Sequence, residues 1–215
     1  MLGRLAEQKS KTLCVLIAPF PIQGTGGFPV KITLLLILVV AAVAVVTVAV
    51  RAAGQNDQNQ QALPAVGQVA PGFTLPSQDG SQISLASFRG KWVVLYFYPK
   101  DMTPGCTIEA HNFQRDQAQY DAAGAVILGV SVDTPDSHKE FCTKEGLTFR
   151  LLADPEHKVV EVYGSLGHFA TFTIANRNTF LIDPTGKIAQ VWTKVQVQHH
   201  SEEVLAALAQ AKSGK

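Results

Sequence analysis

The segment that most constrains the fold is residues 92–111, WVVLYFYPKDMTPGCTIEAH. Its first seven residues are apolar, as in a buried central strand, and Pro99 cannot continue a hydrogen-bonded ladder. Thr103 and Pro104 then indicate a helix start, because a Thr hydroxyl can cap a helix and Pro is tolerated at the first helical position. The segment predicts a strand, a short loop and a helix whose first turn carries Cys106.

Cys106 is either a reactive thiol or a small buried core residue. Free cysteines are among the most buried residue types, which favours the core interpretation for a cysteine without context. A helix N-terminus favours the thiolate, because unpaired N–H groups and the positive end of the helix dipole stabilise negative charge. The strand, proline and helix start before Cys106 therefore favour nucleophilic or redox chemistry.

Strands and helices alternate through residues 67–215. Asp-Gly at 79–80 and Asp-Pro-Thr-Gly at 183–186 indicate turns, and Thr-Pro at 134–135 repeats the helix-start signal. The predicted strands are residues 73–75, 83–85, 92–98, 125–132, 149–152, 179–182 and 188–191, and the predicted helices are residues 104–120, 135–145, 155–163 and 201–211. This order predicts an α/β domain with three layers around a mixed central sheet.

Residues 32–50, ITLLLILVVAAVAVVTVAV, are 19 uncharged residues between Lys31 and Arg51. At ~1.5 Å per residue they match the ~30 Å hydrocarbon thickness of a bilayer and predict a transmembrane helix. A cleaved signal peptide is the alternative, but its apolar core is shorter, roughly 7–15 residues, and leads to a small-residue cleavage site. We therefore expect an uncleaved anchor.

The cations that flank this span predict its orientation. Four precede it and one lies in the twenty residues after it: Arg4, Lys9, Lys11, Lys31 and Arg51. The positive-inside rule then places residues 1–31 in the cytoplasm. Residues 51–66 form a polar linker, and residues 67–215 form the globular domain on the periplasmic or other trans side. Cys14 would be separated from that domain by the membrane.

The composition of residues 67–215 excludes some functions. With 13 Lys/Arg and 15 Asp/Glu, a net charge near −2, and no basic cluster, the domain is not expected to bind nucleic acid. The adjacent His199 and His200 are weak evidence for a metal site, and we interpret them as a solvated loop. We expect no cofactor, no metal and a monomer.

The motif YFYPKDMTPGCTIEA resembles the active-site motif of peroxiredoxins, in particular the Q subfamily (bacterioferritin comigratory protein). The resemblance continues through APGFTLPSQDG, SLASFRGKWVVLYFYPKD, GVSVDTPDSH and RNTFLIDPTGKI, covering nearly all of residues 67–215 and none of the first 66. It implies a thioredoxin-like fold. It also implies reduction of hydrogen peroxide or alkyl hydroperoxides by a cysteine thiolate, with a thioredoxin-like reductant as partner.

The resemblance also implies roles for single residues. Cys106 matches the peroxidatic cysteine, Thr103 the hydroxyl that binds the peroxide, and Pro99 the residue that shields the pocket. Arg177 matches the guanidinium that holds the thiolate, a role that suits its permanent charge and fixed fork of donors; an exposed strand-edge charge is the alternative. Glu109 either orients Arg177 or is a solvated helix residue.

The chain departs from many subfamily members at His111, the position of their resolving cysteine. Only Cys142 remains within residues 67–215, and some members resolve from the helix that carries it. The resemblance therefore implies an intramolecular Cys106–Cys142 disulfide, which would require local unwinding to bring the Cα atoms within ~7 Å. The alternative is a one-cysteine enzyme with Cys142 as a core residue.

Two other functions remain open. A membrane-tethered thiol–disulfide oxidoreductase would suit the fold, but it needs a Cys-x-x-Cys pair, and Thr103 occupies the first of those positions. A peroxide-sensing module would use oxidation of Cys106 to change a partner contact. Catalytic turnover of peroxide distinguishes the peroxidase from the sensor.

Overall fold

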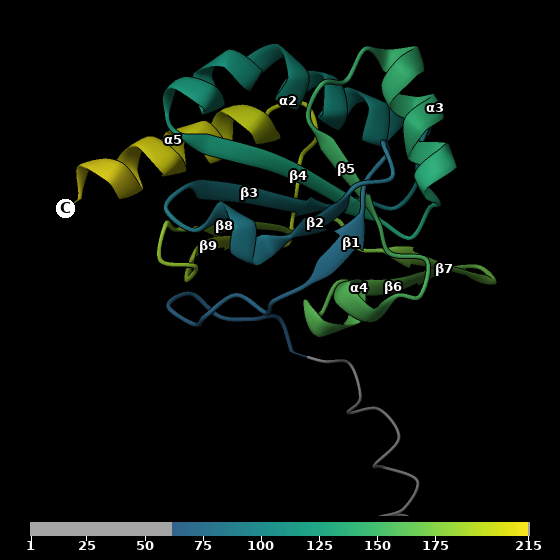
Figure 1. Ribbon diagram of the computed structural model, residues 1–215, viewed down its shortest axis with the longest axis horizontal. Helices are drawn as coiled ribbons and strands as arrows, with labels where there is room; N and C mark the ends of the chain where they lie inside the picture. The colour runs from purple at the N-terminus through teal and green to yellow at the C-terminus, as the bar shows by residue number, and fades with distance from the viewer. Residues whose placement is uncertain (1–61, 215) are drawn as a thin grey trace, which may run out of the picture. The chain divides into compact units, whose positions relative to one another are not determined.

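The computed structural model describes residues 62–214, which fold around a five-stranded mixed sheet (Figure 1). In spatial order the strands are β5 (Arg150–Ala153), β4 (Ala125–Ser131), β3 (Trp92–Phe97), β8 (Thr179–Ile182) and β9 (Ile188–Trp192). The first three are parallel, and β8 and β9 complete the sheet by antiparallel pairing. The predicted mixed sheet and central strand are confirmed.

The central strand β3 separates two hydrophobic cores. Its alternate side chains Trp92, Val94 and Tyr96 pack against α2 (Pro104–Ala122), α3 (Pro135–Glu145) and α5 (His200–Ser213). The side chains between them pack with α4 (Lys158–Val162) and the hairpin of β1 (Thr74–Pro76) and β2 (Gln82–Ser84), which is followed by the short helix η1 (Leu85–Phe88). Figure 1 shows α2, α3 and α5 on one side of the sheet and α4 on the other. The domain therefore has the predicted three layers, because a strand with two apolar faces must be covered on both.

The starts of the two Thr-Pro helices differ from each other. At α3 the Thr134 hydroxyl accepts a hydrogen bond from Ser137 N at 3.3 Å, as a capping side chain should. At α2 the Thr103 hydroxyl instead donates to the carbonyl of Lys100 at 3.0 Å and does not cap the helix. The predicted capping role of the Thr103 side chain is therefore wrong, because the loop after β3 brings a nearby carbonyl acceptor to this hydroxyl.

The α4 helix is shorter than predicted. Residues 155–157 form a turn in which His157 has φ 61°, and the helix starts only after it. The carboxylate of Asp154 accepts hydrogen bonds from Val159 N and Val160 N, both at 2.8 Å. This carboxylate satisfies the free N–H groups of the first turn and so stabilises the late start.

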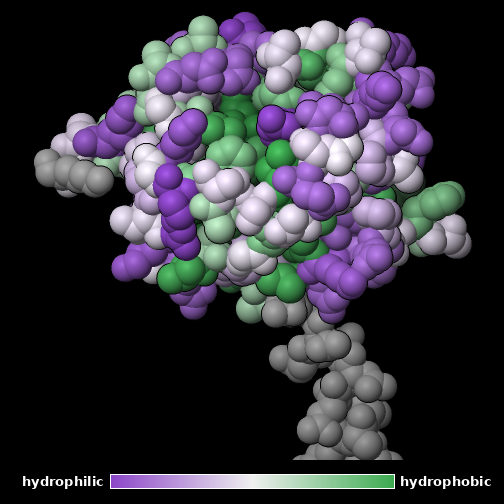
Figure 2. Space-filling view, in the orientation of Figure 1, coloured by the Kyte–Doolittle hydropathy of each residue, from purple (hydrophilic) through white to green (hydrophobic). Residues whose placement is uncertain are grey.

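A second hairpin, absent from the sequence prediction, links α4 to β8. Its strands are β6 (Leu166–Phe169) and β7 (Phe172–Ala175), and its tip exposes Phe169 and Phe172 by 72% and 68%. Figure 2 shows the hairpin as a hydrophobic projection at the right-hand edge. The hairpin leads the chain to the start of β8 and thereby places Arg177 in the short β7–β8 connection.

Residues 1–31, the predicted transmembrane helix at 32–50 and most of the predicted linker lie outside the described residues. Within residues 62–214, none of the helices combines the length and apolar character needed to cross a membrane.

Candidate functional site

Cys106 occupies the first turn of α2, as predicted, and its side chain points into the core. Pro104 stands at the start of the helix, and the thiol is only 2% exposed among residues of β3, α2 and α3. A thiol at this position receives the field of the helix N-terminus and very little water. The site therefore combines a buried sulfur with a local preference for negative charge.

Arg177 reaches this sulfur from the connection between β7 and β8, 71 positions further along the chain. Its Nη2 donates a hydrogen bond to the Sγ of Cys106 at 3.2 Å, and it is the one donor to this sulfur among the described residues. Gly105 permits the approach, because a Cβ at that position would lie 3.3 Å from the same nitrogen. Arg177 is therefore a site residue and not an exposed charge at a strand edge.

Glu109 is the second partner of the guanidinium. Its Oε2 pairs with Nη1 of Arg177, and the carboxyl group is 1% exposed, which excludes the solvated interpretation. Burial raises the pKa of Glu109 to about 7, although Arg177 opposes the rise. Burial alone would lower the pKa of Arg177, but Glu109 and Cys106 raise it above its ordinary value, so the guanidinium stays charged beside the sulfur.

Thr103 and Pro99 lie in the loop between β3 and α2. Both are half-buried, and the Thr103 hydroxyl is held by the carbonyl of Lys100. Within residues 62–214, neither of them donates a hydrogen bond to Cys106. The structure thus gathers Cys106, Arg177 and Glu109 by direct contact, and leaves Thr103 and Pro99 in the loop that leads into α2.

Cys142 lies on the inner face of α3 and belongs to the same core as Cys106. Both thiols are free and buried. Burial, with the charge of Asp101 adding to it, raises the pKa of Cys142 to about 12. Cys142 is therefore protonated in the folded state.

Sequence reasoning did not identify Tyr96, which lies between the helices and the sheet close to both thiols. Its hydroxyl and the Oε1 of Glu109 are buried without hydrogen-bond partners in the described residues. Burial raises the pKa of Tyr96 well above its ordinary value, and Glu109, Cys106 and Cys142 add to the rise. A Cβ on Gly129 would lie 2.7 Å from the Tyr96 ring, so the glycine makes room for it. The sequence did contain a signal for this position. Side chains alternate between the two faces of β3, so Tyr96 lies on the same face as Trp92.

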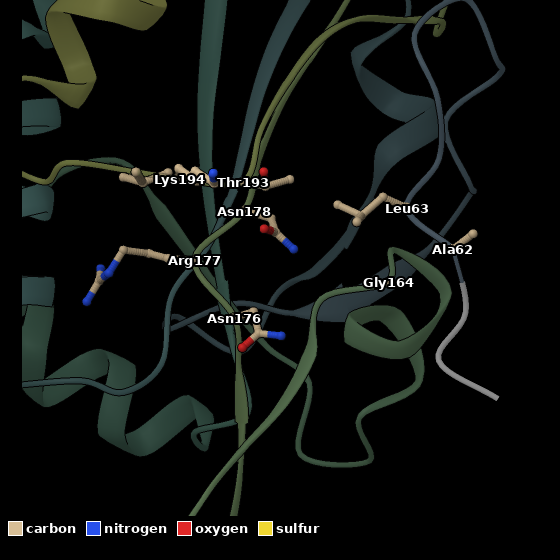
Figure 3. A pocket seen from close by; sticks show the side chains of 9 residues that line it. Ala62, Leu63, Gly164, Asn176, Arg177, Asn178, Thr193 and Lys194 are labelled. Carbon is tan, nitrogen blue, oxygen red and sulfur yellow. The ribbon is translucent and has the colours of Figure 1, made fainter. Parts of the chain in front are cut away.

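A cavity of about 660 Å³ lies next to the β7–β8 connection, and Figure 3 shows its lining. Asn178 points to the side where Leu63 lies, whereas the side chain of Arg177 extends in the opposite direction. Neither Cys106 nor Thr103 lines this cavity. Arg177 does line it, so the cavity and the thiol site share this one residue.

The two adjacent histidines have different surroundings. His199 is 70% exposed, but His200 is fully buried, with its Nε2 2.8 Å from Oγ1 of Thr179 and its ring against Phe113 and Trp192. The predicted solvated loop is therefore wrong for His200, because α5 begins at this residue and turns it toward the core. Residues 62–214 contain no group of three His, Cys, Asp or Glu side chains that could hold a metal ion.

The chain is similar to known proteins of one family. A model described as the AhpC/TSA family matches residues 66–191. The putative peroxiredoxin bcp of Coxiella burnetii is 46% identical over 147 residues, 66% of this chain and 97% of that protein. Peroxiredoxin Bcp of Bacillus subtilis is 41% identical over 147 residues, 66% of this chain and 94% of that protein.

Two solved structures resemble the described domain. A cysteine-to-serine mutant of Xylella fastidiosa PrxQ has a TM-score of 0.67 and 32% identity, covering 70% of this chain and 99% of that one. The bacterioferritin comigratory protein of Xanthomonas campestris, in a study of its alkyl peroxide reduction activity, has a TM-score of 0.62 and 38% identity over 65% of this chain and 91% of that one. The fold is therefore thioredoxin-like, as the sequence resemblance implied.

Proposed function

The chain belongs to the AhpC/TSA family and is a thiol-dependent peroxidase of the peroxiredoxin Bcp type, and on this premise we propose which residues carry out the reaction. Cys106 is the peroxidatic cysteine. The observation that carries this assignment is the 3.2 Å hydrogen bond from Arg177 Nη2 to the Cys106 sulfur at the start of α2. A half-buried cation in contact with the sulfur stabilises the thiolate, which is the nucleophilic form.

In the first step the Cys106 thiolate attacks one oxygen of hydrogen peroxide or of an alkyl hydroperoxide. The S–O bond forms, the O–O bond breaks, and the leaving oxygen takes a proton and departs as water or an alcohol. Negative charge grows on the leaving oxygen, so fixed donors beside the sulfur lower the barrier. Arg177 supplies a positive charge beside the leaving oxygen, and Glu109 holds the Arg177 guanidinium in place. Thr103 donates a hydrogen bond to the bound peroxide, and Pro99 shields the pocket from water.

In the second step Cys142 attacks the sulfenic acid of Cys106. The S–S bond forms, the S–O bond breaks, and the oxygen leaves as water with the proton of Cys142. A thioredoxin-like dithiol then reduces the disulfide and returns both thiols. Because Cys142 is buried in α3, the second step needs local unwinding of that helix.

We also propose that residues 32–50 anchor the chain in a membrane, with residues 1–31 in the cytoplasm and the catalytic domain on the periplasmic or other trans side. The support is the uncharged length of this segment and the excess of cations before it. Protease treatment of sealed vesicles should digest the domain from the trans side only. Recovery of a soluble chain whose N-terminus lies after residue 50 would instead indicate a cleaved signal.

The proposed roles are tested by peroxide consumption with a dithiol reductant. The full chain should turn over many equivalents of peroxide, Cys106→Ser should turn over none, and Cys14→Ser should match the unmodified chain. Consumption of a single equivalent would favour the sensing module. Full turnover by Cys106→Ser would reject the assignment.

A further inference from the structure

A buried polar cluster joins the loop before α2 to the start of α3. We call it the Asp101 cluster, and it consists of the buried Tyr98, Asp101 and His138 and the half-buried Ser137. Oδ2 of Asp101 lies 2.8 Å from His138 Nδ1 and accepts a hydrogen bond from Ser137 Oγ at 2.7 Å, and Oδ1 accepts one from the Tyr98 hydroxyl at 2.7 Å. The Asp101 and His138 side chains are 3% and 0% exposed, so this is an interior contact and not a surface ion pair.

The cluster connects the two segments that carry the thiols. Asp101 precedes Cys106 by five residues in the loop that leads into α2. His138 precedes Cys142 by four residues, so both side chains lie on the inner face of α3 one turn apart. The first turn of α3 therefore cannot unwind without breaking the hydrogen bonds of Ser137 and His138 to Asp101.

The far end of α3 is held less firmly. His111 Nε2 lies 3.0 Å from Glu145 Oε2, but the His111 side chain is 50% exposed. Exposed ion pairs add little to stability, whereas hydrogen bonds to a buried charge are among the stronger contacts in a protein. The Asp101 cluster is thus the stronger of these two polar contacts at the ends of α3.

The same carboxylate also suppresses the reactivity of Cys142. Burial alone would raise the pKa of Asp101, but hydrogen bonds from His138, Ser137 and Tyr98 keep it below its ordinary value, so the group is charged. That charge adds to burial in disfavouring the Cys142 thiolate. Release of α3 would therefore remove a steric and an electrostatic barrier together.

We propose that the Asp101 cluster controls the release of Cys142, so that its opening sets how the Cys106 sulfenic acid divides between disulfide formation and further oxidation. This inference rests on the proposed Cys106–Cys142 step. The members of the Asp101 cluster are positioning residues in it, because within the described residues none of them hydrogen-bonds a cysteine sulfur. When the cluster is closed, a second peroxide can oxidise the sulfenic acid to sulfinic acid; when it is open, Cys142 displaces water from it.

The test follows both steps in the full chain. Reduced protein is mixed rapidly with one equivalent of hydrogen peroxide and quenched at set times with a thiol-alkylating agent and a sulfenic-acid trap, and the products are resolved by mass. Ser137→Ala, which removes one hydrogen bond to Asp101, should speed disulfide formation about ten-fold, the factor expected for a weak hydrogen bond to a charged group. His138→Asn should speed it further. Both variants should need correspondingly more peroxide to form sulfinic acid.

Thr143→Ala is the matched control, because it removes a hydroxyl from the same helix that bonds only to the Lys139 carbonyl. It should leave the rate of disulfide formation unchanged, and Glu145→Gln should change it by less than Ser137→Ala. Equal rates of disulfide formation in Ser137→Ala and the unmodified chain would overturn the role of the cluster while leaving the proposed peroxidase cycle intact. Absence of any Cys106–Cys142 disulfide in the unmodified chain would overturn both.

Discussion

The guanidinium of Arg177 hydrogen-bonds the sulfur of Cys106 at 3.2 Å, although the two residues are 71 positions apart in the chain. The contact depends on two elements that meet at the end of the sheet, the start of α2 and the β7–β8 connection. It gives the buried thiol a permanent cation. The reactivity of Cys106 is thus a property of the tertiary fold as much as of its position in a helix.

Loss of this guanidinium should slow the first chemical step. Arg177→Ala is expected to lower the second-order rate constant for oxidation of Cys106 by hydrogen peroxide by about 10²–10³-fold, the usual effect of removing one donor at a site of developing charge. Stopped-flow mixing measures this constant. Arg150→Ala, which removes a surface partner of Asp79, is the control and should react at the unmodified rate. A rate for Arg177→Ala within two-fold of the unmodified chain would remove Arg177 from the mechanism.

Gly105→Ala should separate stability from activity. Alanine is favoured over glycine inside a helix by roughly 0.5–1 kcal/mol, so the free energy of unfolding should rise slightly. The new methyl group would lie 3.3 Å from Arg177 Nη2, so the guanidinium must shift and peroxide reduction should slow by about ten-fold. Chemical denaturation and stopped-flow rates measure the two effects. Unchanged reactivity would show that the guanidinium tolerates the displacement.

Glu109 should make the domain less stable as the pH rises. Its pKa is about 7 in the folded protein against an ordinary 4.5, so folding favours the protonated form. This stabilisation is complete below pH 4.5 and is lost as the pH rises through 7, by an amount on the order of 3 kcal/mol. Glu109→Gln cannot ionise and should lack this loss. Urea unfolding at pH 5 and pH 8 measures the difference, and an equal pH slope in both proteins would contradict the raised pKa.

His200 should make the domain less stable as the pH falls. Burial lowers its pKa to about 4 from an ordinary 6.5, although Glu203 opposes the shift, so the folded protein favours the neutral ring. The stabilisation is present above pH 6.5 and is lost as the pH falls through 4, again on the order of 3 kcal/mol. His200→Asn should remove this acid dependence, whereas substitution of the exposed His199 by Asn should not. Identical acid unfolding of the two variants would show that burial of His200 has no such consequence.

Much of the site could be predicted because it lies in one local segment. The apolar run of β3, its end before Pro99 and the helix start before Cys106 are all local signals, and the structure bears them out. The position of Arg177 followed from the family resemblance, since nothing in its neighbouring residues distinguishes it from a surface charge. Its contact with Glu109 could be proposed only as one of two alternatives.

The features that the sequence did not predict depend on residues that are far apart in the chain. His138 and Asp101 are 37 positions apart, and a histidine in the polar sequence PDSHKEFCTKE gives no sign that it will be buried. His200 is likewise buried by Phe113 and Trp192, which come from other elements. The β6–β7 hairpin has an exposed aromatic tip instead of turn residues between alternating strands, so the usual hairpin signal is absent.

In the proposed cycle Cys106 reduces the peroxide and Cys142 resolves the resulting sulfenic acid. Peptide mapping by mass spectrometry after one equivalent of hydrogen peroxide tests this most directly. We expect a cross-linked pair of peptides containing Cys106 and Cys142, formed with loss of both free thiols. Sulfenic or sulfinic acid at Cys106 together with a free Cys142 would contradict it.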